Sequence, residues 1–198
     1  MSKIDKILIG TNNDGKYREI RDLLPNHIEK FSPKEFNLKS PDENGKTFEE
    51  NSFIKASYFS KKTNLICLSD DSGLEIDILK GMPGIYSSRW AEGKKNFDSA
   101  IERVFKEINN IQKGSKYNVI AKFVCSMTLY WPKGKSYSAR GEVKGKISLE
   151  KKGKNGFGYD PIFIPNGHDL TFAEMDPELK MSIDHRQNAF LKIKEFLN

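Results

Sequence analysis

The sequence has few of the residues and segments that would place it in several common classes of protein. It holds two cysteines and three scattered histidines among 198 residues, with no CxxC pair, so a structural zinc site is not expected. No apolar run approaches the roughly 20 residues that span a bilayer, and the N-terminal residues lack the long apolar stretch of a signal peptide. We therefore expect a cytoplasmic protein with no membrane association, in which Cys67 and Cys125 are reduced and behave as small hydrophobic residues.

The charge of the chain is positive but not concentrated in blocks. The formal net charge is +6, which suits an anionic partner such as a polyphosphate, although a lysine-rich solvated surface would give the same value. The sequence shows no run of like charges and no aromatic signature of RNA-binding domains, so nucleic acid is not an expected partner. Internal repeats and low-complexity tracts are also lacking.

What the sequence does contain is typical of one α/β domain spanning residues 1–198. With 37% hydrophobic residues the chain can bury a sizeable core, and no linker composition interrupts it. Apolar patterning and turn residues predict both strands and helices. The expected strands are 6–10, 27–31, 65–68, 74–78, 118–131, 136–148 and 161–164, and the expected helices are 17–24, 47–62, 97–111 and one that begins at Pro177.

Two adjacent acids follow the apolar run of residues 65–68. Asp70 and Asp71 precede Ser72-Gly73, which predicts that a buried strand ends at the acids and that a second strand begins at Leu74. Acids at the carboxyl end of a buried strand lie where open α/β sheets bind ligands, and Mg²⁺ would compensate their charge. Capping of a turn by one aspartate explains the same residues equally well.

A second feature is a polar loop between the first strand and the first helix. Residues 10–16, GTNNDGK, almost match the GxxxxGK of a Walker A loop, but Tyr17 stands where a Ser or Thr should bind Mg²⁺. A strand, a glycine-containing loop and a helix direct backbone N–H groups at an anion, and Lys16 adds a positive charge. The pattern favours phosphate binding by a protein that is not a P-loop NTPase, or else an ordinary strand–helix turn.

Three further segments carry polar residues that could join these two. Thr47 begins a helix through the capping box Thr47-Phe48-Glu49-Glu50, and Asn51, Lys55 and Phe59 share one face of it. The glycine-rich loop 151–160 holds Phe157 where its ring could stack on a base or fold into the core. The last helix carries the pair His185-Arg186, which by itself would be expected at the surface.

Together these segments resemble the inosine triphosphate pyrophosphatase family along nearly the whole chain. The matching segments are TNNDGKYRE at 11–19, TFEENSFIKA at 47–56, SDDSGLEID at 69–77, GMPGIYSSR at 81–89, GFGYDPIF at 156–163 and TFAEMDPELKMSIDHR at 171–186. The resemblance implies an α/β fold with a long central mixed β-sheet, flanking helices and two lobes around a deep cleft, in a homodimer. It also implies Mg²⁺-dependent hydrolysis of deaminated purine nucleoside triphosphates (ITP, dITP, XTP) to the monophosphate and pyrophosphate.

The resemblance also implies a role for individual residues. Asp71 would be the catalytic base and a metal ligand, with Glu43, or Asp42 in its place, as the other ligand to Mg²⁺. The residues expected to bind substrate are Thr11, Asn12, Asn13, Asp14, Gly15 and Lys16 for the triphosphate, Lys55 for phosphate, Ser72 beside the substrate, and Phe157, Gly158, Tyr159, Asp160, Lys180, His185 and Arg186 around the base.

The sequence departs from the family pattern at two positions that bear on these roles. Asn12 stands where glycine is usual, and Asp184 replaces the serine that usually precedes the His-Arg pair. We expect Asn12 to stiffen the loop, and Asp184 either to alter base preference or to face solvent. A non-catalytic nucleotide- or RNA-binding protein with a basic cleft is the alternative function. The intact acids at 70–71 argue against it, because acids repel phosphate unless a metal intervenes.

Overall fold

A computed structural model of the protein describes residues 4–91, 97–112 and 118–197. Strands and α-helices alternate up to residue 130, and two further strands and then two α-helices follow. The strands are β1 (Lys6–Ile9), β2 (Glu29–Phe31), β3 (Cys67–Ile76), β4 (Ile120–Tyr130), β5 (Ser136–Ile147) and β6 (Phe163–Pro165), and the α-helices are α1 (Asp14–Leu23), α2 (Phe48–Thr63), α3 (Asp98–Ile111), α4 (Pro177–Ile183) and α5 (His185–Ile193).

The six strands form one mixed sheet in the order β2-β1-β3-β4-β5-β6. β1 is parallel to β2 and to β3, with Leu8 opposite Cys67, whereas β5 and β6 are antiparallel. This arrangement confirms the expected α/β class with a mixed central sheet. No helix among the described residues is long and apolar enough to cross a membrane.

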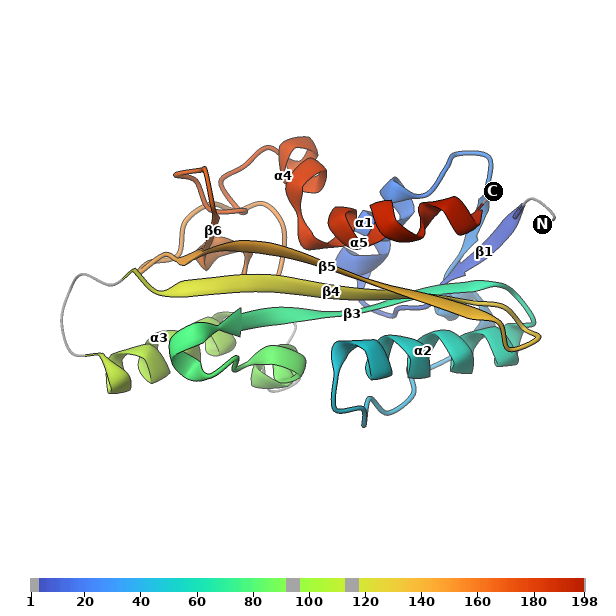
Figure 1. Cartoon of the computed structure of the whole chain (residues 1–198), viewed down its shortest axis with the longest axis horizontal. Helices are drawn as coiled ribbons and strands as arrows, with labels where there is room; N and C mark the ends of the chain where they lie inside the picture. Colours follow the sequence, from blue (N-terminus) through green and yellow to red (C-terminus); the bar gives the residue numbers. More distant parts are fainter. Residues whose placement is uncertain (1–3, 92–96, 113–117, 198) are drawn as a thin grey trace. The chain divides into compact units, whose positions relative to one another are not determined.

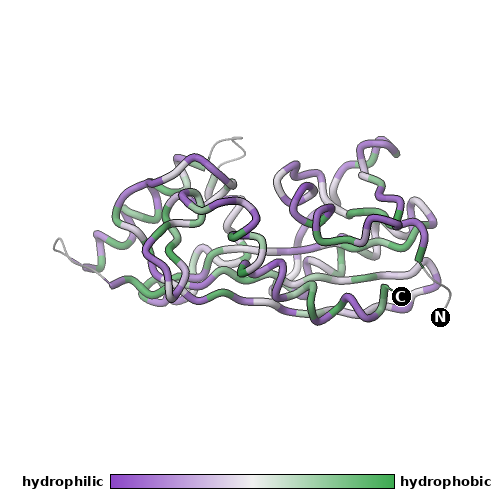
Figure 2. The backbone as a smooth tube through the Cα atoms, turned by 90° about the horizontal axis from the view of Figure 1, so that it is seen from above, coloured by the Kyte–Doolittle hydropathy of each residue, from purple (hydrophilic) through white to green (hydrophobic). Residues whose placement is uncertain are grey.

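Residue contacts divide the chain into two compact units. Unit 1 comprises residues 1–71, 125–141 and 185–198, and unit 2 comprises residues 72–124 and 142–184. Each unit has its own hydrophobic core, and along the chain apolar stretches alternate with hydrophilic ones (Figure 2).

In unit 1 helices cover both faces of the strands, with α1 and α5 on one face and α2 on the other (Figure 1). Successive side chains of a strand point to opposite faces. Accordingly Ile7 and Ile9 of β1 pack with Ile20 of α1, while Leu8 packs with Phe59 of α2. All five side chains are fully buried. A strand buried on both faces has no solvent side, so any polar group on it must find its partners inside the protein.

The core of unit 2 is built around α3. The apolar stripe of this helix, which includes Ile101, Val104 and Ile108, is buried against Leu74 and Ile76 at the end of β3. The sequence pattern predicted this helix and its buried stripe correctly.

Three predicted boundaries were wrong. β3 does not end at Asp70 and Asp71 but continues through Ser72 and Gly73 to Ile76 as one strand of ten residues. The last helix is not continuous: Asp184, with an extended backbone (φ −75°, ψ 171°), separates α4 from α5. The predicted start of the first helix was three residues too late, since α1 begins at Asp14 rather than Tyr17.

Thr47 caps α2 as the sequence predicted, whereas the Glu50 side chain bonds one residue before the N-cap instead of completing the predicted capping box. Thr47 is the N-cap, and its Oγ1 accepts a hydrogen bond from the N–H of Glu50 at 3.1 Å. The Glu50 side chain accepts one from the N–H of Lys46 at 2.6 Å. The first contact satisfies the Glu50 N–H, a donor that a helix start otherwise leaves unpaired.

We predict that Thr47→Ala lowers the free energy of unfolding by about 1 kcal/mol, because the capping hydroxyl is lost. Thr47→Ser keeps the hydroxyl and should retain most of this stability. Urea unfolding of the three proteins measures the difference. An equal loss in the serine variant would show that the hydrogen bond is not the cause.

Candidate functional site

The two acids of β3 lie in unit 1 and are almost completely buried. Asp70 is 0% and Asp71 5% exposed. Buried carboxylates are costly unless cations or hydrogen-bond donors compensate them. The sequence suggested that they stand at the end of a strand, where solvent or a metal could do so. In the middle of a strand, the compensation comes from side chains of the surrounding helices.

The negative charge of Asp70 is compensated by cationic side chains of α1 and α5. Its Oδ2 lies 3.3 Å from Lys16 Nζ and 3.3 Å from Arg186 Nε. Arg186 also pairs with Glu19 through Nη1 at 2.7 Å. Burial alone would raise the pKa of the Asp70 carboxyl, but the charges of Lys16 and Arg186 hold this pKa well below its usual range.

The negative charge of Asp71 is compensated by two side chains of α2. Lys55 Nζ lies 3.2 Å from Asp71 Oδ1, and Asn51 Nδ2 donates to Asp71 Oδ2 at 3.2 Å. Lys55 Nζ also donates to Glu43 Oε1 at 2.9 Å. One ammonium group therefore lies between two carboxylates, those of Asp71 and Glu43.

The pKa values of these groups respond to burial and charge in different ways. Burial alone would lower the pKa of the Lys55 ammonium, but the charges of Asp71 and Glu43 outweigh it and raise this pKa to about 12. Burial raises the pKa of the Asp71 carboxyl, and the charge of Lys55 opposes this rise. The negative charge of the Asp71 carboxylate is thus less fully compensated than that of the Asp70 carboxylate.

The loop of residues 11–16, in unit 1, is fixed by its own polar side chains. Thr11 is buried, and its Oγ1 accepts from the N–H of Asn13 at 3.2 Å. Asn13 is the N-cap of α1, where its Oδ1 accepts from the N–H of Lys16 at 3.0 Å. Gly15 is buried, and Asp14 pairs with the exposed Lys34.

Asn12 connects this loop to the segment that leads to Glu43. Its Nδ2 donates to Leu38 O at 3.3 Å and to Ser40 Oγ at 3.1 Å. A glycine at this position could make neither bond. The structure also distinguishes the two alternatives for the second metal ligand. Glu43 contacts Lys55, whereas Asp42 is exposed.

Unit 2 holds the second group of predicted residues. Lys180, 5% exposed, donates to Asp160 Oδ2 at 2.7 Å and lies 5.3 Å from the centre of the Phe157 ring. The same carboxylate oxygen accepts from the N–H of Phe157 at 2.8 Å. Gly156 has φ +73°, and a Cβ there would lie 2.1 Å from Asp160 Oδ2, so only glycine fits beside this carboxylate.

Not all predicted residues of unit 2 take part in this group. Tyr159 is buried in the core, and its hydroxyl donates to Ser87 O at 3.0 Å. Ser72 is a half-buried residue of β3, and Gly158 has φ +67°. Phe157 itself is half-buried rather than part of the core.

The pair His185-Arg186 is buried, which the sequence did not suggest. His185 is 2% exposed and Arg186 3% exposed. His185 Nε2 lies 3.2 Å from Arg186 Nη1. Asp184 is 1% exposed, so the expectation that it might face solvent was wrong.

Sequence reasoning assigned no role to Glu19 or Asn51, both of which hold residues of this site. Helical spacing was the available signal, because Glu19 follows Lys16 by three residues and Asn51 precedes Lys55 by four. Residues at these spacings lie on one face of a helix, so each of the two shares a face with a predicted lysine, although the structure pairs Glu19 with Arg186 and Asn51 with Asp71.

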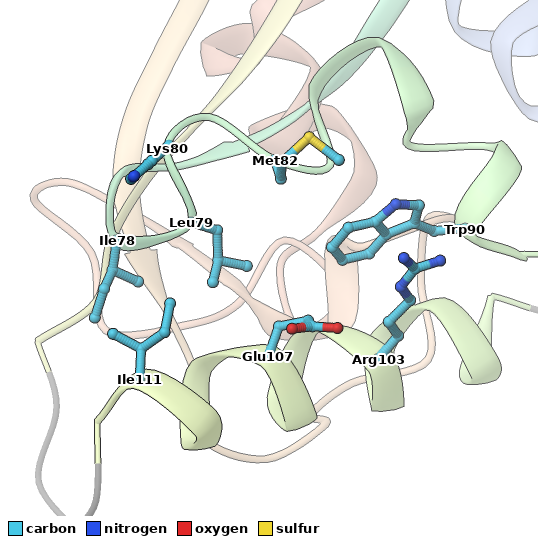
Figure 3. Close-up of a pocket in the computed structure, with 8 residues that line it drawn as sticks. All are labelled: Ile78, Leu79, Lys80, Met82, Trp90, Arg103, Glu107 and Ile111. Atoms are coloured by element: carbon cyan, nitrogen blue, oxygen red, sulfur yellow. The ribbon is translucent and has the colours of Figure 1, made fainter.

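Among the described residues no group of three or more His, Cys, Asp or Glu side chains gathers as a metal site. A cavity of about 320 Å³ lies in unit 2 between α3 and the segment 78–90 (Figure 3). It is lined by Ile78, Leu79, Lys80, Met82, Trp90, Arg103, Glu107 and Ile111, none of which is a predicted site residue. The carboxylate and lysine groups, rather than this mainly apolar cavity, match the predicted phosphate chemistry.

Comparisons with known proteins identify the family of this chain. The model of the Ham1 family matches residues 7–196. The chain belongs to the Ham1 family. It is 43% identical to the dITP/XTP pyrophosphatase of Rhodospirillum centenum, over 96% of this chain and 93% of that protein. It is 42% identical to the dITP/XTP pyrophosphatase of Rhizobium meliloti, over 94% of each.

Solved structures of the Ham1 family share the fold. A HAM1 protein from Coxiella burnetii superposes with a TM-score of 0.85 at 35% identity, covering 97% of this chain and 98% of that one. The nucleoside-triphosphatase / dITP/XTP pyrophosphatase of Mycobacterium abscessus does so with a TM-score of 0.74, also at 35% identity, over 95% and 98% of the two chains. The expected family is therefore confirmed.

We predict that Asp70→Asn lowers the free energy of unfolding at pH 7 by about 3 kcal/mol, because it leaves buried cations without their carboxylate. Asp22→Asn, which breaks an exposed pair with Arg21, should cost less than about 1 kcal/mol. Urea unfolding curves compare the two.

The cost of Asp70→Asn should also depend on pH. The pKa of Asp70 in the folded protein lies below the unfolded value of about 3.9, so the unfolded state binds more protons as the pH falls. The stabilisation is present above about pH 4 and decreases below it, so the variant and the wild type should converge in acid. A difference that stays constant down to pH 2 would contradict this origin.

Proposed function

We propose that this Ham1-family protein hydrolyses deaminated purine nucleoside triphosphates (dITP, XTP and ITP) to the monophosphate and pyrophosphate. The observation that carries the proposal is the contact of Lys55 with both Asp71 and Glu43. In this contact the buried carboxylate of Asp71, which can accept a proton, lies beside the ammonium group of Lys55, which can hold phosphate. The printed function of the relatives, dITP/XTP pyrophosphatase, supports the same reaction.

In the proposed reaction a water oxygen forms a bond to the α-phosphorus, and the bond from that phosphorus to the bridging oxygen of the β-phosphate breaks. Pyrophosphate leaves with the electron pair of this bond. Asp71 accepts the proton of the attacking water. Its raised pKa suits this role, because a general base works best when its pKa approaches the working pH.

The phosphates would be held by unit 1. Lys16 and Lys55 supply fixed positive charge, and the first turn of α1 supplies backbone N–H groups. Thr11, Asn12 and Asn13 hold the loop in shape through the hydrogen bonds described above. A rigid loop positions phosphate better than a mobile one, because less entropy is lost on binding.

The residues present fit a magnesium ion. Glu43 and Asp71 converge on the same ammonium group, which shows that their oxygens can approach one cation, and carboxylate oxygens are the ligands that Mg²⁺ prefers. Two protein carboxylates are enough, because Mg²⁺ usually keeps waters and binds substrate phosphates. When bound, it would neutralise phosphate charge and lower the pKa of a bound water.

For the base we propose Phe157 as the stacking residue, with Lys180 and Asp160 fixing its loop. Hypoxanthine and xanthine carry an oxygen at C6 where adenine carries an amino group. Arg186, oriented by Glu19 and Asp70, and His185 beside it are the proposed donors to that oxygen. Adenine would leave a buried donor unpaired, which costs about 1–3 kcal/mol.

The homodimer that the family resemblance implies is also a proposal. Sedimentation equilibrium of the purified protein tests it directly, with a mass of twice 22.6 kDa as the expected result.

The product of the reaction tests the proposed function. We expect malachite-green detection of phosphate from dITP or XTP only when inorganic pyrophosphatase is added, and only with Mg²⁺ present. ATP should react more slowly by about 5- to 150-fold, the factor equivalent to 1–3 kcal/mol. Phosphate release without added pyrophosphatase would indicate an orthophosphate-releasing NTPase. Binding of XTP without turnover would indicate the non-catalytic alternative.

We predict that Asp71→Asn lowers kcat by at least about 10²-fold, because general-base catalysis typically contributes 10²–10⁴-fold. The control is Asp77→Asn, which changes an exposed carboxylate six positions further along the chain and should leave kcat unchanged. Initial rates with XTP and thermal unfolding of each protein measure the effect. Near-normal turnover by a folded Asp71→Asn protein would refute the role of Asp71.

We predict that Phe157→Ala raises KM for XTP by about 5- to 150-fold with little change in kcat, because stacking contributes about 1–3 kcal/mol per base. Phe157→Tyr keeps an aromatic ring and should behave like the wild type. Steady-state kinetics of both variants separate KM from kcat. A larger effect on kcat than on KM would argue against simple stacking.

A further inference from the structure

Asn51 lies completely buried in the first turns of α2, between the loop that carries Glu43 and the strand that carries Asp71. Both ends of its amide are used. Nδ2 donates to Asp71 Oδ2 at 3.2 Å, and Oδ1 accepts from the backbone N–H of Gly45 at 2.9 Å. One side chain thus connects the two segments that carry the proposed metal ligands.

The loop approaches this amide so closely that a side chain at residue 45 would not fit. A Cβ on Gly45 would lie 2.6 Å from Asn51 Oδ1 and 2.7 Å from Glu50 Cβ. The first contact is far shorter than any ordinary van der Waals distance and involves a side chain fixed by its other bond. Gly45 is therefore needed for the close approach, two residues after Glu43.

Lys55 connects the same two segments one helical turn further along α2. It reaches Glu43 at 2.9 Å and Asp71 at 3.2 Å. These are ion pairs, so an incoming cation competes with the ammonium for the carboxylates, and an incoming phosphate competes with the carboxylates for the ammonium. The amide of Asn51 is neutral, and neither ligand competes strongly for its two hydrogen bonds.

We propose that Asn51 is a positioning residue, which sets the spacing of the Glu43 and Asp71 carboxylates and keeps it when Lys55 exchanges partners during binding. The inference rests on the proposed function, because it assigns Glu43 and Asp71 to the same metal ion. Asn51 does not touch the substrate in this account and acts only through the loop and the strand.

A double-mutant cycle of Gly45→Ala and Glu43→Ala tests the loop end of this contact. Gly45→Ala should raise the Mg²⁺ concentration for half-maximal XTP hydrolysis by about tenfold or more, the scale of coupling between groups in contact. In the Glu43→Ala background the same change should have less than about a twofold effect, because the carboxylate that the loop positions is gone. A purely structural role would change both backgrounds equally, so additive effects would overturn the proposal.

Binding of Mn²⁺ to the nucleotide-free protein, followed by electron paramagnetic resonance, gives a readout that does not depend on turnover. Gly45→Ala and Asn51→Leu should each weaken binding by about tenfold or more. Asn44→Ala, which removes an exposed side chain of the same loop, should bind like the wild type. Thermal unfolding identifies any variant that does not fold. If Asn51→Leu does not fold, Gly45→Ala still tests the proposal, because it keeps the Asn51 side chain and disturbs only its contact with the loop.

The two hypotheses fail in different ways. If the wild type releases no pyrophosphate from dITP or XTP, the proposed function fails, whatever the variants do. If the wild type is active but Gly45→Ala and Asn51→Leu match it in Mn²⁺ binding, or if no protein binds Mn²⁺, the positioning role of Asn51 fails while the proposed function stands.

Discussion

The burial of two neighbouring carboxylates in the middle of β3 determines how unit 1 is built. Asp70 and Asp71 are within a strand covered on both faces, so their charges must be met by the protein. Asp70 receives its cations from α1 and α5, and Asp71 receives its donors from α2. The three helices are therefore tied to the sheet by charge as well as by apolar packing. Loss of either carboxylate would leave buried positive charge behind.

The two carboxylates differ in how fully their charges are compensated, and the difference is consistent with the separate tasks that we propose for them. Asp70 has its pKa held low and its partners fixed, which suits a structural anchor for Lys16 and Arg186. Asp71 has its pKa raised by burial and shares its lysine with Glu43, which suits a group that must accept a proton and bind a further cation. Sequence position alone cannot separate adjacent aspartates in this way, because the separation depends on which helix each one faces.

Local patterns predicted most of the elements. The capping box at Thr47 and the apolar stripe of α3 gave those helices nearly to the residue, because both signals are contained in one segment. The end of a strand at Asp70 was wrong because its cations come from residues as distant in sequence as Arg186. The break at Asp184 was missed, although Asp184 with Gln187 three positions later fits an N-terminal capping pattern. The candidate site was predicted through the family resemblance, whereas the bonds of Asn51 to Asp71 and Gly45 are contacts between segments distant in sequence, which local patterns do not show.

The set of paired charges in unit 1 has a consequence for the species that binds there. Among the ion pairs described above, four carboxylates, those of Glu19, Glu43, Asp70 and Asp71, contact three cations, those of Lys16, Lys55 and Arg186. The positive charge of these three groups is thus already met by carboxylates when the acids are ionised. A bare triphosphate would meet repulsion, whereas a nucleotide that arrives with its own divalent counterion brings less negative charge. On the proposed function, the cluster would therefore favour the metal–nucleotide complex over the free nucleotide.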